Sequence, residues 1–77
     1  MKTLYINLRS IEDVKEFVNT ITKIDGDALL SEGRFIVDAK SIMGIFSLNL
    51  TNRLKLDIEE WKEEYVPLFE QYLAADE

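Results

Sequence analysis

The chain has 77 residues, of which 47% are hydrophobic and 31% are charged, and its net charge is −6. This length holds one small core, so residues 1–77 are expected to form a single folded domain. Neither cysteine nor histidine is present. Disulfides, thiolate metal sites and reactions of an imidazole are therefore excluded, and the acidic balance without a basic cluster argues against direct nucleic-acid binding.

The first two expected elements are a strand and an amphipathic helix. Residues 3–8 alternate apolar and polar side chains, as in a half-buried strand. Ser10 is a typical helix N-cap, and Glu12 and Asp13 fall in the first turn, where the helix dipole favours negative charge. Gly26 is expected to stop this helix. Its apolar stripe comprises Ile11, Val14, Phe17, Val18, Ile21 and Ile24.

A hairpin is expected next. Residues 28–30 and 34–38 are apolar-rich and flank Ser31-Glu32-Gly33. Gly33 supplies the positive φ angle that a tight turn needs.

A short helix and a strand follow the hairpin. Ser41 is expected to cap the helix, whose apolar residues recur at spacings of three and four. They are Ile42, Ile45 and Phe46. Residues 49–52 indicate a loop, and in residues 54–58 Leu54, Leu56 and Ile58 alternate with charged side chains, which predicts a half-buried strand.

The last segment is expected to be helical, with two alternatives for its start. Pro67 would break a helix that ran straight through it, so we place it in the first turn of the final helix. A kinked helix beginning near Glu60 is the alternative. The apolar stripe of this segment comprises Trp61, Tyr65, Leu68, Phe69, Tyr72 and Leu73. The carboxylates Glu59, Glu60, Glu63 and Glu64 are interpreted as a solvated face rather than a metal or acid–base site.

The element order β-α-β-β-α-β-α predicts an α+β fold. We expect a four-stranded, mostly antiparallel sheet with the helices on one face, which is an open-faced β-sandwich. The other sheet face should be open or lightly covered, with Tyr5 and Ile36 as candidates for that side.

Three segments together with this element order resemble the HPr family, the phosphocarrier proteins of the bacterial sugar phosphotransferase system. The residues Ala39-Lys40-Ser41-Ile42-Met43-Gly44, followed by Ser47-Leu48, are similar to the family's regulatory serine motif. Ser31-Glu32-Gly33 and Phe17-Val18 are also similar to family members. The resemblance implies an HPr-like fold for the whole chain.

The sequence departs from the family at the phosphorylated position. Members normally carry phosphate on a histidine just before the first helix, followed by an arginine. An alignment on Phe17-Val18 sets Ser10 at the histidine position and Glu12 at the arginine position. Serine does not form a phosphoramidate, and Glu12 would repel a phosphate that arginine binds. The resemblance therefore implies the fold and a partner surface, but not the histidine phosphorelay.

Ser41 has two interpretations. As a helix cap alone it would contribute roughly 1 kcal/mol. In Gram-positive members the corresponding serine is modified by HPr kinase/phosphorylase, so the resemblance makes Ser41 a candidate regulatory phosphorylation site. A phosphate at a helix N-terminus meets free N–H groups, which permits this chemistry.

A two-turn helix cannot bury all its apolar residues, so either Ile42 and Ile45 belong to the core with the others partly exposed, or an apolar patch is exposed. The resemblance implies that such a patch contacts partner proteins, and the candidate partner-binding residues are Ile42, Met43 and Phe46. The leading hypothesis is an HPr-like regulatory or binding protein that is neither an enzyme nor a phosphocarrier. The alternative is a degenerate paralogue with a structural or oligomeric role, such as a homodimer, and no phosphorylation. A carrier that uses Ser10 is a third hypothesis, disfavoured because no histidine or lysine stands at a suitable spacing.

The expected partners are proteins: HPr kinase/phosphorylase or a transcriptional regulator. No cofactor, metal, nucleic acid or membrane partner is expected. Residues 1–9 lack the long apolar run of a signal peptide, and no segment approaches a membrane-spanning length, so a cytoplasmic location is expected.

Overall fold

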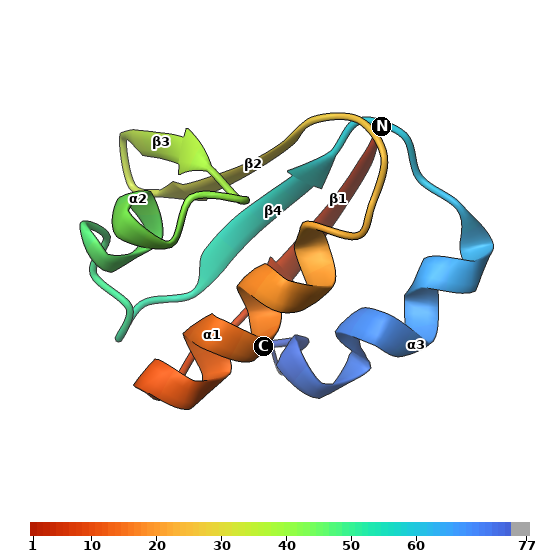
Figure 1. The fold of residues 1–77 in the computed structure, drawn as a ribbon. Helices are drawn as coiled ribbons and strands as arrows, with labels where there is room; N and C mark the ends of the chain where they lie inside the picture. The colour runs from red at the N-terminus through yellow and green to blue at the C-terminus, as the bar shows by residue number, and fades with distance from the viewer. Residues whose placement is uncertain (75–77) are drawn as a thin grey trace.

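The computed structural model of the protein describes residues 1–74. Its elements follow the predicted β-α-β-β-α-β-α order, and the last helical segment is divided into three short pieces (Figure 1). The elements are β1 (Lys2–Ile6), α1 (Ile11–Ile21), β2 (Ala28–Glu32), β3 (Phe35–Asp38), α2 (Ile42–Phe46), β4 (Leu54–Ile58), the 3₁₀ turn η1 (Glu63–Tyr65), α3 (Val66–Phe69) and the 3₁₀ turn η2 (Glu70–Tyr72).

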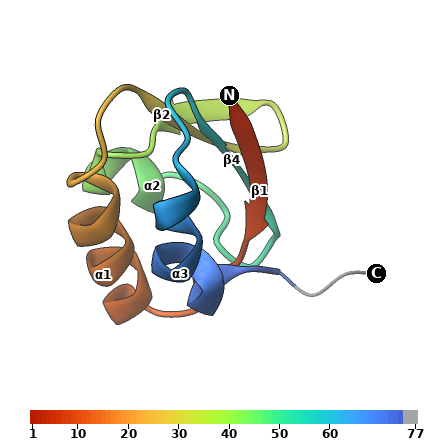
Figure 2. The same cartoon turned by 90° about the vertical axis from the view of Figure 1, so that its right-hand side faces the viewer.

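The four strands form one sheet in the order β1-β4-β2-β3. Each neighbouring pair of described strands is antiparallel. The three helices lie on the same side of this sheet (Figure 2). The predicted open-faced α+β sandwich is therefore confirmed.

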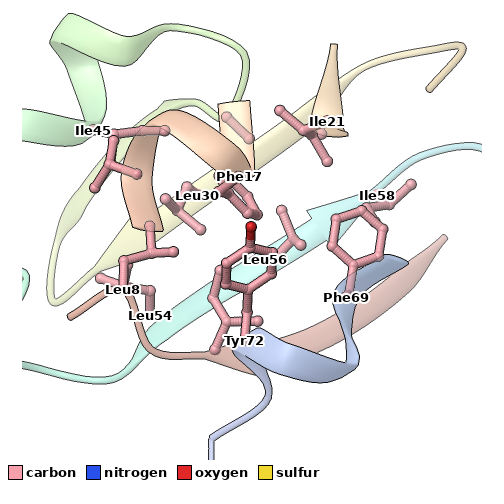
Figure 3. Packing of buried hydrophobic residues seen from close by; sticks show 14 of the residues in the cluster. Leu8, Phe17, Ile21, Leu30, Ile45, Leu54, Leu56, Ile58, Phe69 and Tyr72 are labelled. Atoms are coloured by element: carbon pink, nitrogen blue, oxygen red, sulfur yellow. The ribbon is translucent and has the colours of Figure 1, made fainter. Parts of the chain in front are cut away.

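The core lies between the sheet and the helices. β4 is central, and its residues Leu54, Leu56 and Ile58 are fully buried, as their alternation with charged residues predicts. Figure 3 shows Phe17 of α1 and Tyr72 of the C-terminal segment meeting over Leu56. The two aromatic rings pack edge to face with centroids 5.6 Å apart.

Among residues 1–74, no helix lies on the opposite sheet face. Tyr5 is 47% exposed and Ile36 is 64% exposed. Tyr5 lies opposite Lys55, and Ile36 lies opposite Ser31, in rows that alternate with the buried ones. The expectation that both side chains belong to the open face is confirmed.

β1 ends at Ile6, two residues earlier than predicted. The N–H of Asn7 donates to the carbonyl of Tyr72 at 2.8 Å, and the N–H of Ala74 donates to the carbonyl of Tyr5 at 2.8 Å. The C-terminal segment thus covers part of the outer edge of β1. This contact joins residues far apart in the chain, so the alternation of residues 3–8 could not reveal it.

α1 ends at Ile21, before the predicted stop at Gly26. The N–H of Lys23 bonds the carbonyl of Thr20, three residues back, so the last turn tightens. Ile24 is still buried although it lies beyond the helix. Ile11, which the helical stripe assigned to the core, is 61% exposed, whereas Val14, one turn further along the helix, is fully buried.

The hairpin is shifted relative to the prediction. β2 extends through Ser31 and Glu32, and the turn consists of Gly33 and Arg34. Gly33 has φ +60°, and no other residue of this turn has a positive φ. A two-residue turn with glycine first matches the twist of the paired strands.

The final segment begins at Glu63, so the kinked helix starting near Glu60 does not form. Pro67 lies in the first turn of α3, as predicted. Tyr65, Phe69 and Tyr72 are buried, whereas Leu68 and Leu73 are more than 40% exposed. Two of the six stripe residues were therefore wrong, because the 3₁₀ turns change the helical period.

Candidate functional site

The amino end of α1 is closed by Ser10 and Asp13. The Oγ of Ser10 accepts the N–H of Asp13 at 3.1 Å, and a carboxylate oxygen of Asp13 accepts the N–H of Arg9 at 2.9 Å. These reciprocal bonds satisfy two amides that the helix itself cannot pair. The hydroxyl of Ser10 thus acts as a helix cap, as its position in the sequence predicted. Glu12, on the same turn, is exposed.

The amino end of α2 is closed by Ser41 in the same way. Its Oγ accepts the N–H of Gly44 at 3.2 Å, and the side chain is half-buried. A Cβ on Gly44 would lie 3.2 Å from the Cβ of Val37. Glycine therefore lets this short helix pack closely against β3.

Lys40 anchors the start of α2 to the segment that follows α1. Its Nζ donates to the carbonyls of Ile24 at 2.7 Å and Gly26 at 2.9 Å. The ammonium thus satisfies two carbonyls beyond the end of α1. This contact fixes the adjacent residue Ser41 relative to the first helix.

A hollow of about 580 Å³ lies between the amino end of α1 and the carboxyl end of α2. Its lining is mainly apolar, with the Ser10 region on one side and Phe46 on the other. The lining residues are Asn7, Leu8, Arg9, Ser10, Ile11, Phe46, Leu50 and Thr51. The hollow brings together two of the sequence-predicted site residues, Ser10 and Phe46, but its lining does not include Glu12, Ser41 or Met43.

The loop after α2 forms one wall of the hollow and is held by Glu32. One carboxylate oxygen of Glu32 accepts the N–H of Asn49 at 3.3 Å, and the other accepts the side-chain amide of Asn52 at 3.0 Å. The Oδ1 of Asn49 accepts the hydroxyl of Thr51 at 2.6 Å. These bonds fix the positions of Leu50 and Thr51 in the wall of the hollow.

The candidate partner patch on α2 is exposed unevenly. Met43 is 76% exposed and Phe46 is 40% exposed, whereas Ile42 is half-buried and packs against the core. Ile45, the remaining apolar residue of this helix, is fully buried. Met43 and Phe46 are therefore the side chains of α2 that can contact another molecule most readily.

The sequence pattern did not predict six of the residues that line the hollow: Asn7, Leu8, Arg9, Ile11, Leu50 and Thr51. The exposure of Ile11 had a local signal, because it follows the N-cap Ser10 directly and so begins the helix. Leu50 and Thr51 had none, since their place depends on the bonds of Glu32 across the fold.

Two kinds of reactive side chain are missing from the sequence. It has no imidazole or thiol, and among residues 1–74 no three or more acidic side chains are grouped to hold a metal ion. Burial, followed by the charges of Glu16 and Asp13, raises the pKa of Tyr72, which lies in the core away from the hollow. Within the described part of the chain, no helix is long and apolar enough to cross a membrane.

The fold is that of a small open-faced β-sandwich protein, with a hollow at the amino end of its first helix. Among solved structures, the chain is similar to the crystal structure of HPr-C-His from Thermoanaerobacter tengcongensis, with 30% sequence identity and a TM-score of 0.75. The match covers 88% of this chain and 85% of that chain. The chain belongs to the HPr family, and its fold is that of a phosphocarrier-related protein.

No family model matches the sequence, and no curated protein matches it. The similarity of the whole fold to an HPr structure nevertheless supports the resemblance to the HPr family that the Ser41 segment indicated.

Proposed function

We propose that this HPr-like protein does not carry phosphate on histidine and acts instead through protein–protein contacts, as a regulatory or binding protein related to the sugar phosphotransferase system. The observation that supports this most is the absence of histidine from a chain of a phosphocarrier family. We place its work in the cytoplasm, and we assign it no catalytic activity.

In this proposal Ser10 takes the position of the family histidine and Glu12 that of the arginine. The Ser10 hydroxyl already accepts the N–H of Asp13, and a phosphoserine would lack the high transfer potential of a phosphoramidate. The carboxylate of Glu12 would also repel an incoming phosphoryl group. The two residues therefore favour a contact surface over a phosphoryl-transfer site.

The contact surface we propose consists of the hollow and the exposed side of α2. The hollow offers Ile11 and Leu50 beside Phe46, and Met43 adds an exposed apolar side chain on the same short helix as Phe46. Apolar surface next to polar rims is typical of protein-binding sites.

Ser41 is the proposed regulatory site on this surface. A phosphate would add about two negative charges next to the exposed Met43. Its oxygens would accept hydrogen bonds from backbone N–H groups in the first turn of α2, which have no partner within the helix. Phosphorylation would thus change an apolar patch into a charged one and alter the choice of partner.

The test is phosphorylation by HPr kinase/phosphorylase with ATP, followed by intact-mass measurement. We expect one added phosphoryl group in the wild type and none in Ser41→Ala. Ser31→Ala is the matched control, because Ser31 lies on the sheet away from α2, and it should be labelled as the wild type is. Met43→Asp should slow labelling without loss of the fold, since this side chain is 76% exposed.

An unmodified wild-type protein, with the kinase active on an ordinary HPr, would contradict the Ser41 assignment. A second arm uses phosphoenolpyruvate and enzyme I, which should leave the protein unlabelled. Labelling lost in Ser10→Ala would establish a Ser10 carrier and overturn the proposed function.

The second candidate function is a structural or oligomeric role without phosphorylation. The exposed apolar residues of β3 favour it specifically, because no strand within residues 1–74 pairs with the outer side of β3.

A further inference from the structure

β3 leaves an open edge on the sheet. It is the last strand in the order β1-β4-β2-β3, so within residues 1–74 no strand pairs with its outer side. The outer edge of β1, by contrast, is partly covered through the bridge between Ile6 and Leu73. Phe35 is 63% exposed and Ile36 is 64% exposed. Exposed apolar edge strands are ready templates for pairing with another chain.

The direction of the backbone groups along β3 follows from its pairing with β2. The N–H of Ala39 donates to the carbonyl of Ala28 at 2.9 Å, so this amide points toward β2. Successive residues of an antiparallel strand point their N–H and C=O groups to alternate sides. The backbone N–H and C=O groups of Phe35 and Val37 therefore point toward β2. The backbone groups of Ile36 and the N–H of Asp38 point outward, away from the sheet edge.

We propose that β3 pairs with β3 of a second copy of this chain, antiparallel and centred on Ile36. The two Ile36 residues would then lie opposite each other and exchange both backbone hydrogen bonds. The outward N–H of Asp38 in each copy would donate to the carbonyl of Arg34 in the other. Phe35 of each copy would lie opposite Val37 of the other, on the helix-covered face.

The charges at the two ends of β3 favour a second copy of this chain as the partner, in the register centred on Ile36. The segment Arg34-Phe35-Ile36-Val37-Asp38 is self-complementary when antiparallel. Centring on Ile36 sets the Arg34 guanidinium of each copy opposite the Asp38 carboxylate of the other. A register centred on Asp38 would oppose two carboxylates, and one centred on Val37 would set Ile36 opposite Asp38. Opposite charges across a strand pair stabilise it, and like charges destabilise it.

This pairing joins two four-stranded sheets into one. Its two-fold axis is normal to the sheet at Ile36, so the helices of both copies lie on the same face. The α2 helices, which pack against Val37, fall on opposite sides of the axis. One strand pair buries less surface than a standard interface of about 1,600 Å². We therefore expect weak association, in the micromolar to millimolar range.

The test is sedimentation velocity over a concentration series that reaches the millimolar range. In a pair of Arg34→Asp chains, two carboxylates lie opposite each other at both ends of the strand pair. In a pair of Asp38→Arg chains, two guanidinium groups lie opposite each other at both ends. Each variant should associate at least about tenfold more weakly than the wild type. An equimolar mixture of the two variants restores opposite charges at both ends, so it should associate at least as strongly as the wild type.

Arg53→Asp is the matched control, because it makes the same charge change on β4's flank, where Arg53 stacks on Tyr5 at 4.8 Å. It should associate as the wild type does. Circular dichroism checks the fold of Asp38→Arg, since the Asp38 carboxylate also accepts the N–H of Lys40. A monomeric wild type, an Arg34→Asp variant that associates as the wild type does, or folded variants that fail to associate when mixed would each overturn the proposal. None of these outcomes depends on the kinase assay.

Discussion

Tyr72 is a buried side chain with an unpaired polar atom. It is 2% exposed, and its hydroxyl has no hydrogen-bond partner among residues 1–74. Its ring packs against Phe17 edge to face (Figure 3). The ring therefore contributes to the core, while the hydroxyl costs free energy because it is removed from water without a new partner.

Tyr72→Phe keeps the ring and removes this hydroxyl. We expect the free energy of unfolding to stay the same or rise by up to about 1 kcal/mol. Urea denaturation measures the change, and Tyr5→Phe, at an exposed position, provides the control. A loss of more than about 1 kcal/mol in Tyr72→Phe would mean that the hydroxyl has a stabilising partner.

The raised pKa of Tyr72 also predicts a dependence of stability on alkaline pH. Burial and then the charges of Glu16 and Asp13 disfavour the phenolate in the folded state. The unfolded chain therefore loses this proton first, at about pH 10, so stability is full below that pH and falls as the pH rises through it. Above about pH 10, the urea midpoint of Tyr72→Phe should fall less steeply with rising pH than that of the wild type. Parallel pH curves would contradict this assignment.

Single residues show what local patterns can and cannot predict about the site. Ser10 and Ser41 were predicted as caps because capping depends on residues within one turn. The hollow between the two helices was not predicted. The hollow forms only if Leu50 lies near Ser10. The position of Leu50 depends on the hydrogen bond between the Glu32 carboxylate and the N–H of Asn49, which is 17 residues away in the sequence.

At the scale of elements, α2 depends on contacts outside itself. It has five residues, Ile42–Phe46, which is too few for a stable helix in isolation. The cap of Ser41, the close contact of Gly44 with Val37 and the anchor of Lys40 hold it in place. The position of the candidate regulatory serine thus rests on neighbouring elements.

Lys40→Met tests the anchor between α2 and the end of α1. Methionine keeps the apolar stem but removes the ammonium, so the carbonyls of Ile24 and Gly26 lose their partner. We expect a loss of about 2 kcal/mol in the free energy of unfolding. Lys15→Met, on the exposed side of α1, is the control and should change little. Equal urea midpoints for the two variants would show that the anchor contributes nothing.

The elements themselves were largely predictable, but their ends were less so. The alternation in β4 and the turn signal of Gly33 are local. The first predicted the right strand, and the second predicted the hairpin but not the extension of β2 through Glu32. The end of α1 at Ile21 and the exposure of Leu68 and Leu73 were not predicted. A tightened helical turn in each region changed the period on which the stripe prediction relied.

The whole molecule is held by one core that joins its first helix to its C-terminal segment. The ring centroid of Phe17, on α1, lies 6.3 Å from the ring centroid of Phe69 and 5.6 Å from that of Tyr72. The backbone of the same segment bonds the end of β1. A chain of 77 residues has a total stability of about 4 to 12 kcal/mol, so loss of one central contact can remove much of it.

Phe17→Ala should therefore affect the whole fold rather than α1 alone. The side chain is fully buried, and its truncation costs about 3 to 5 kcal/mol through lost burial and the cavity left behind. We expect a strongly lowered urea midpoint, with the fluorescence of Trp61, which packs near Phe69, changing in the same transition as helical circular dichroism. Lys15→Ala on the exposed face of α1 should stay within about 0.5 kcal/mol of the wild type. Two separate transitions in Phe17→Ala would instead mean that the C-terminal segment unfolds independently, and a loss below about 1 kcal/mol would mean that the core repacks around the missing ring.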